Sequence, residues 1–230
     1  MRAVIVACGL LLLGGCATDG QSNPPWAGLT GSSCTKLSGD QELSLNLADD
    51  MAREGKLHAS LANLQSLPER QAQVQLRKAR IYRQLGRAEA EPLYRGLLGT
   101  CLEAEGEHGL GQLAAGRGNY PLATSHLERA AKLAPTDDKI RNDLGVVYLN
   151  QLRIDDARFE FLTALELKQE DSLAALNLVT LLLFQDNWSQ ASELVTRAGL
   201  TPEQVSDAQA RAIELKAQTV KVISPVAAIH

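Results

Sequence analysis

The sequence predicts an all-α protein in which about five helix-turn-helix repeats stack into a solenoid that a C-terminal helix caps. The apolar residues follow a helical period almost continuously over residues 41–218, and no stretch alternates like a strand before the last dozen residues. Small residues recur 34 positions apart, as in the series Ala123, Ala157 and Ala191. Aromatic residues make up only 4% of the chain, which suits helices rich in Ala and Leu better than a sandwich or barrel.

The first 15 residues have the pattern of a cleaved signal. Arg2 is followed by the uncharged, mostly apolar stretch 3–13, which as a helix would cross only about half of a ~30 Å hydrocarbon core. The Leu-Gly-Gly-Cys sequence that ends at Cys16 resembles the lipobox of bacterial lipoproteins, whose cysteine becomes the first mature residue and carries a diacylglyceryl group. This resemblance implies a lipid anchor on Cys16. Because Ala17 follows instead of an inner-membrane retention aspartate, it also implies the periplasmic face of the outer membrane.

Residues 16–40 lead from the lipidated cysteine to the repeats. Gly, Ser, Thr, Asn and Pro dominate this segment, so it has too few apolar groups to offset the entropy of ordering and is expected to be a flexible linker. With Cys8 and Cys16 in the signal, Cys34 and Cys101 remain in the mature chain. Two cysteines in an oxidising periplasm are a candidate disulfide, and two independent thiols are the alternative.

Five helical hairpins account for the repeat pattern, three of them clear and two weak. The clear hairpins keep small residues at matching positions, such as Gly111 and Gly145. The last hairpin retains Ala191 and Ala198 but has Val179 where a glycine is expected. The second hairpin shows the same order of small and bulky residues with a single deletion: Ala79, Tyr82, Gly86, Ala90, Tyr94 and Leu97. The first is shorter and degenerate, with Ala48, Met51, Gly55, Ala59 and Leu64, so that the first and the last hairpin are the weak ones.

The small residues have a packing reason, because two helices approach closely only where Gly or Ala faces a bulky side chain. One hairpin predicts both partners, the bulky Leu144, Tyr148 and Phe161 and the small Gly145, Ala157 and Ala164. No hairpin buries its apolar face alone, so successive hairpins stack. The pattern L-G-V-V-Y followed by A-R-F-E-F-L-T-A resembles the tetratricopeptide-repeat (TPR) family, although Gln169 stands where that family usually has Pro.

A capping helix and a tail are expected after the repeats. The sequence T-P-E-Q at residues 201–204 supplies an N-cap, a proline at the first helical position and a glutamine for a capping box. The amphipathic helix that follows is expected to end near Gln218, so that the solenoid and its cap span residues 41–218. The tail, residues 219–230, is apolar and β-branched, and it either remains without regular structure, packs on the cap or adds an edge to a partner.

The sequence offers no residue set for catalysis, a cofactor or a metal ion. Glycines between Gly109 and Gly118 look like part of a phosphate loop, but an acidic segment precedes them instead of a strand. Four histidines lie far apart without ligand spacing: His58, His108, His126 and His230. Asp137 and Asp138 suit a helix N-terminus better than acid-base catalysis. A net charge of −4 argues against nucleic acid as a partner.

The expected functional surface is the concave face that the first helix of each TPR repeat lines. The resemblance implies that this face binds a peptide or a helix of a protein partner. The candidate residues are cationic or amide side chains: Arg77, Arg80, Arg83, Gln84, His108, Gln112, Asn142, Asn150 and Asn177. A solvated helix face is the alternative for each residue. The Lys/Asn pattern that clamps a free C-terminal carboxylate in some TPR proteins is incomplete here.

In length and layout, the chain resembles the TadD family, the TPR lipoproteins of the tight-adherence (Tad/Flp) pilus system. This resemblance implies that the groove binds a secretin subunit or another pilus-assembly protein, while the lipid attaches the chain to the outer membrane. Other assignments remain open: a pilotin of type IVa pili, a lipidated scaffold for peptidoglycan hydrolases, or a catalytic lipoprotein without a recognisable site.

Overall fold

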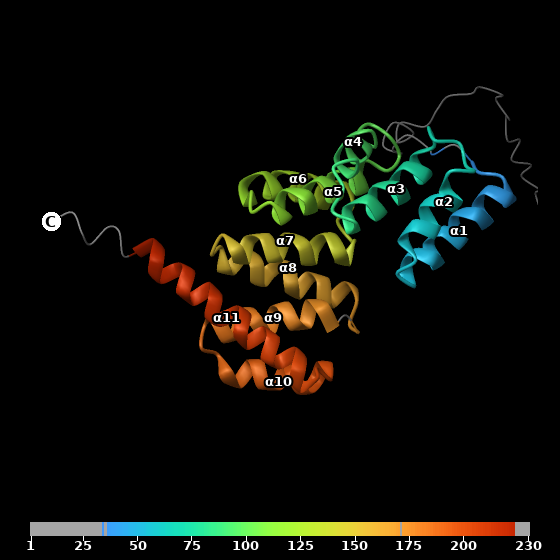
Figure 1. The fold of residues 1–230 in the computed structure, drawn as a ribbon. Helices are drawn as coiled ribbons and strands as arrows, with labels where there is room; N and C mark the ends of the chain where they lie inside the picture. The colour runs from blue at the N-terminus through green and yellow to red at the C-terminus, as the bar shows by residue number, and fades with distance from the viewer. Residues whose placement is uncertain (1–33, 35, 171, 224–230) are drawn as a thin grey trace, which may run out of the picture. The chain divides into compact units, whose positions relative to one another are not determined.

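The structure is a computed structural model that describes residues 34, 36–170 and 172–223. Within these residues the chain forms eleven α-helices and no strand (Figure 1). The helices are α1 (Gly39–Arg53), α2 (Leu57–Leu64), α3 (Ala72–Gln84), α4 (Ala90–Arg95), α5 (Glu103–Gly116), α6 (Tyr120–Leu133), α7 (Asp138–Asn150), α8 (Ile154–Leu167), α9 (Ser172–Phe184), α10 (Trp188–Ala198) and α11 (Pro202–Ile223). None of the described helices is long and apolar enough to span a bilayer.

Consecutive helices pair into five hairpins, from α1 with α2 to α9 with α10, and α11 packs against α9 (Figure 1). The first helices of neighbouring hairpins also touch, so α3 contacts α5 and α5 contacts α7. This arrangement confirms the predicted all-α solenoid of five repeats with a C-terminal capping helix. The two hairpins with the weakest sequence pattern, at the ends of the array, are both present.

Close packing explains the glycines that recur in the sequence. A Cβ atom added to Gly145 in α7 would lie 2.6 Å from two ring carbons of Phe161, and one added to Gly111 in α5 would lie 2.6 Å from Leu127 Cγ. Gly109 lies against the ring of Tyr94 in the same way. Gly109 and Gly111 are therefore inside a helix that needs small residues for packing, which agrees with the sequence argument against a phosphate loop.

Helix ends follow the predicted capping chemistry. Asp137 Oδ1 accepts hydrogen bonds from the backbone N–H groups of Lys139 and Ile140 at the start of α7. Before α11, the Gln204 side chain accepts from the Thr201 N–H, and the Thr201 hydroxyl accepts from the Gln204 N–H. The helix continues to Ile223 instead of ending near residue 218. A β-branched residue lowers helix propensity by at most ~0.7 kcal/mol, so the β preference of this short stretch does not end the helix.

A disulfide joins Cys34, in the segment before α1, to Cys101, just before α5. Of the two alternatives that the sequence leaves open, the structure contains the bonded pair. The bond closes a loop with a sequence separation of 67 residues that contains the whole of α1 to α4. The first two hairpins are therefore fastened at both of their chain ends.

The buried apolar side chains form three clusters. The largest has 24 residues contributed by α5 to α11, including Ala114, Leu144 and Phe161. The first two hairpins depend on two smaller clusters, with seven buried residues around α1 to α3 and six around α3 to α5. The N-terminal hairpins thus have much less apolar core than the rest of the array.

Candidate binding groove

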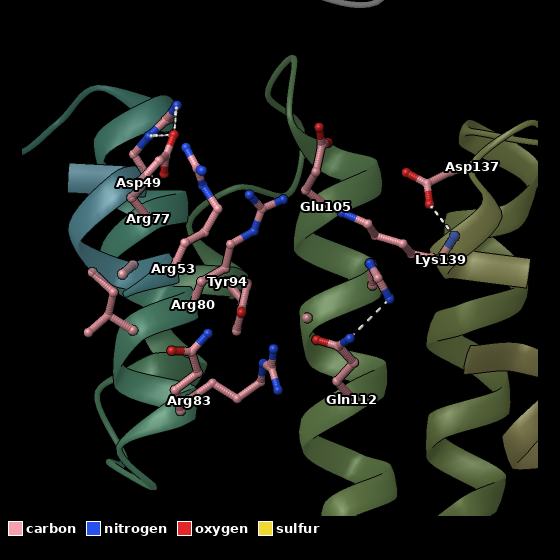
Figure 2. Close-up of a pocket in the computed structure, with 15 residues that line it drawn as sticks. Asp49, Arg53, Arg77, Arg80, Arg83, Tyr94, Glu105, Gln112, Asp137 and Lys139 are labelled. Atoms are coloured by element: carbon pink, nitrogen blue, oxygen red, sulfur yellow. Dashed lines mark hydrogen bonds and ion pairs between the residues drawn. The ribbon is translucent and has the colours of Figure 1, made fainter. Parts of the chain in front are cut away.

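A groove of about 560 Å³ lies against the first helices of the first four hairpins. Its side chains come from α1, α3, α5 and α7, with Tyr94 of α4 at its base (Figure 2). Six of the nine sequence-predicted binding residues line it: Arg77, Arg80, Arg83, Gln84, His108 and Gln112. The repeat register thus placed these side chains on one surface, although whether they bind a partner stays a prediction.

The three arginines of α3 have different environments. Arg77 is bound to Asp49 of α1, with its Nε 3.0 Å and its Nη2 2.7 Å from Asp49 Oδ2, and only 20% of its side chain is exposed. Arg80 and Arg83 project from α3 toward α5 (Figure 2), and within the described part of the chain neither side chain makes an ion pair or hydrogen bond. Arg77 therefore joins two hairpins, whereas Arg80 and Arg83 are available to a ligand.

His108 and Gln112 are held by Asp143 of the next repeat. His108 Nε2 lies 2.7 Å from Asp143 Oδ2, and Gln112 Nε2 donates to the same oxygen at 2.6 Å. Burial opposes ionisation of Asp143, but these hydrogen bonds and the nearby imidazole outweigh it and hold the pKa of its carboxyl below the usual range. The pair thus forms a fixed wall of the groove and also ties α5 to α7.

The three predicted asparagines do not line this groove. Asn142 is buried and accepts a hydrogen bond from Asn177 Nδ2 at 2.8 Å, which connects α7 to α9. Asn150 donates to a backbone carbonyl of its own helix and accepts from Tyr120 and from Arg211 of α11. The three asparagines lie on first helices, as expected. Their side chains, however, form hydrogen bonds that connect neighbouring helical hairpins and the capping helix.

Sequence reasoning missed several groove residues at the ends of helices. Arg53 comes from the last turn of α1, and Lys139 from the first turn of α7, where the sequence predicts the capping role of the aspartates and no ligand contact. Glu105 of α5 is the third such residue. The repeat offset could have found Glu105 and Lys139, because they lie 34 residues apart and precede the glycines of their helices at the same distance.

A buried ionic cluster outside the groove was also missed. Glu107 of α5 lies 2.5 Å from His126 Nδ1 and accepts from Arg129 Nε at 2.7 Å. Burial disfavours the charged form of Glu107, but Arg129 and His126 outweigh this and lower the pKa of its carboxyl. The cluster joins α5 to α6 and has a structural explanation. No group of three or more His, Cys, Asp or Glu residues that could hold a metal ion occurs in the described residues.

Cys16 and the linker up to residue 33 lie outside the described residues, as do residues 224–230 of the tail. The lipidation of Cys16 therefore stays a prediction from the sequence.

Five stacked helical hairpins with a charged groove along their first helices define a helical-repeat scaffold. Residues 114–175 match the family model described as tetratricopeptide repeat. The chain is also 42% identical over 215 residues to TPR repeat-containing protein PA4299 of Pseudomonas aeruginosa, a match that covers 92% of this chain and 85% of that protein. The chain belongs to the family of TPR repeat proteins and is a TPR-type scaffold for protein interaction.

Solved structures share the fold at low sequence identity. PilF of Pseudomonas aeruginosa is 16% identical with a TM-score of 0.61, over 80% of this chain and 91% of that chain. A chain of the APC/C hetero-tetramer Cut9-Hcn1 is 17% identical with a TM-score of 0.64, over 74% of this chain and 35% of that one. MamA of Desulfovibrio magneticus RS-1 is 17% identical with a TM-score of 0.54, over 76% and 99% respectively. At these identities the likeness concerns the fold alone.

Proposed function

We propose that this chain is a lipid-anchored adaptor at the periplasmic face of the outer membrane, which binds a secretin subunit or another assembly component of a Flp/Tad-type pilus. The observation that carries the adaptor role is the groove. Five cationic side chains and three carboxylates line it, although the whole chain has a net charge of −4. A concentration of cationic side chains on the partner-facing helices of a TPR array supports binding of a protein segment there.

The anchor is proposed from the sequence that ends at Cys16. Acyl chains each contribute about 0.8 kcal/mol per buried methylene, and two or more chains make anchoring stable. The 16–40 linker would then separate the repeats from the membrane surface and allow the groove to meet a partner in the periplasm. The pilus assignment rests on the resemblance to TadD-family lipoproteins in length and layout, and the fold likeness to PilF is compatible with it.

The anchor is tested with Cys16→Ser. We expect this variant to remain folded, with an unchanged circular dichroism spectrum, but to be unlipidated and lost from the outer membrane fraction. Cys8→Ser, which alters the other cysteine of the signal, is the matched control and should fractionate like the wild type. Retention of Cys16→Ser in the outer membrane would show that a protein surface provides the attachment.

The partner is tested by affinity capture from detergent-solubilised envelopes, with the bound proteins identified by mass spectrometry. Both the wild type and Cys16→Ser serve as bait, so that capture by the groove is separated from association through lipid. Recovery of a secretin and other pilus-assembly proteins by both baits is the expected result. Recovery of peptidoglycan hydrolases without a secretin would keep the adaptor role and refute the pilus assignment.

A further inference from the structure

Two arginines of the groove have no side-chain partner in the described part of the chain. Arg80 is exposed, Arg83 is half-buried, and neither side chain forms an ion pair or a hydrogen bond there. Arg83 Nε is buried and has no acceptor. By contrast, Arg77 is bound to Asp49 and Arg53 to Asp50. Arg80 and Arg83 therefore differ from their neighbours in having their charge free for a ligand.

The other charges of the groove do not cancel this pair. Asp49 is bound by Arg77, so that Glu105 and the capping carboxylate Asp137 stand against three cations, Arg80, Arg83 and Lys139. Lys139, on the α7 side, has no ion-pair partner among the described residues and extends toward α5 (Figure 2). A groove with unpaired cations on two of its sides, in a chain of negative net charge, favours a negatively charged segment.

We propose that the groove binds an extended peptide segment with acidic side chains at alternate positions. Arg80 and Arg83 are three residues apart on α3, which is a rise of about 4.5 Å along the helix. Side chains on one face of an extended peptide recur every ~6.6–6.8 Å, a spacing that two flexible arginine side chains can span. Consecutive acidic residues would point to opposite faces and could not both meet this pair.

The chemistry of arginine suits this ligand. A guanidinium binds a carboxylate through two parallel N–H···O bonds, and the two terminal Nη atoms of Arg83 can form this pair without its buried Nε. Gln84, exposed on the next position of α3, has an amide that can pair with a peptide backbone. The inference rests on the proposed function, since it assumes that the groove is the partner-binding surface, and it specifies the chemical class of the segment that binds.

The test selects ligands from a random-peptide library on the full-length protein in detergent. The wild type should enrich peptides with Asp or Glu at alternate positions, and the double variant Arg80→Gln/Arg83→Gln should lose this enrichment. Arg70→Gln/Arg197→Gln removes the same charge from exposed arginines outside the groove and should behave like the wild type. For a selected peptide, we expect at least tenfold weaker binding by the groove variant, and a similar loss when the acidic residues of the peptide become Gln.

Two outcomes of the peptide selection would overturn the inference: selected peptides without acidic enrichment, or equal enrichment by the groove variant. Loss of binding to anionic vesicles by the groove variant, without acidic enrichment of peptides, would assign the two arginines to a lipid surface and also overturn it. If the groove variant still captures the secretin, the inference fails and the proposed function survives. If acidic peptides bind as expected but no pilus-assembly protein is captured from envelopes, the pilus assignment fails and the inference stands.

Discussion

Removal of the disulfide should loosen the first two hairpins and leave the rest of the array unchanged. The double variant Cys34→Ser/Cys101→Ser opens a loop with a sequence separation of 67 residues. For that length, the chain-entropy relation gives a loss of about 4 kcal/mol in the free energy of unfolding at 25 °C. The loss falls on α1 to α4, which are enclosed by the bond and depend on the two small apolar clusters. In a solenoid each repeat contacts only its neighbours, so destabilisation at one end can remain local.

Hydrogen exchange followed by mass spectrometry measures this difference along the chain. Amide protection in α1 to α4 should fall by up to about a thousandfold, the equivalent of ~4 kcal/mol. Protection in α7 to α10 should remain within a few-fold of the wild type. Wild-type protein treated with a reductant is the control and should match the variant. An equal loss of protection in all helices, or a loss below tenfold in α1 to α4, would refute the reasoning.

Three further predictions concern single residues. Gly145→Ala places a Cβ 2.6 Å from the buried ring of Phe161, so an overpacking cost of about 1–3 kcal/mol should exceed the ~1 kcal/mol gained in helix propensity. The midpoint temperature of thermal unfolding should therefore fall. The control Gly116→Ala adds its Cβ in open space and should not lower this temperature. Leu152 has a φ of 60° and occupies the left-handed turn position that glycines occupy in the first three hairpins. Leu152→Gly should therefore raise the free energy of unfolding by roughly 1 kcal/mol, measured by urea denaturation. A lower urea concentration at the unfolding midpoint would contradict this. The third prediction concerns Glu107, whose pKa is lowered in the folded state, so that its stabilisation is present above the unfolded pKa and is lost as pH falls through the folded value. The free energy of unfolding of the wild type should therefore fall more steeply below about pH 4 than that of Glu107→Gln. Parallel plots of this free energy against pH for the two proteins would argue against the charged cluster.

The solenoid could be predicted because close helix contacts restrict residue type. Position 145 must be small and position 161 bulky for the two helices of the hairpin to pack closely. The same pair of small and bulky residues therefore recurs in each hairpin that has this contact. The same offset placed Arg80 and Arg83 in the groove. It could not reveal that Arg77 is bound to Asp49, because that partner lies 28 residues earlier in a degenerate hairpin.

The asparagines show a second limit of repeat reasoning. Asn142 and Asn177 occupy neighbouring first helices, and the sequence interpretation treated both as ligand contacts. Their side chains are within hydrogen-bonding distance of each other, so they connect two repeats. A periodic pattern predicts the face on which a side chain lies, but the partner of a polar group depends on the distance to the next helix, which the pattern does not contain.

The division of the apolar core has a consequence for ligand binding. Arg80 belongs to a helix packed in the small N-terminal clusters, whereas Lys139 begins a helix packed in the large one. A segment that contacts both residues would hold the two regions together, and its binding energy would add to the stability of their junction according to ligand concentration and affinity. Occupancy of the groove would then protect the N-terminal hairpins from local unfolding. The bound partner would thus stabilise the end of the solenoid that has the smaller apolar core.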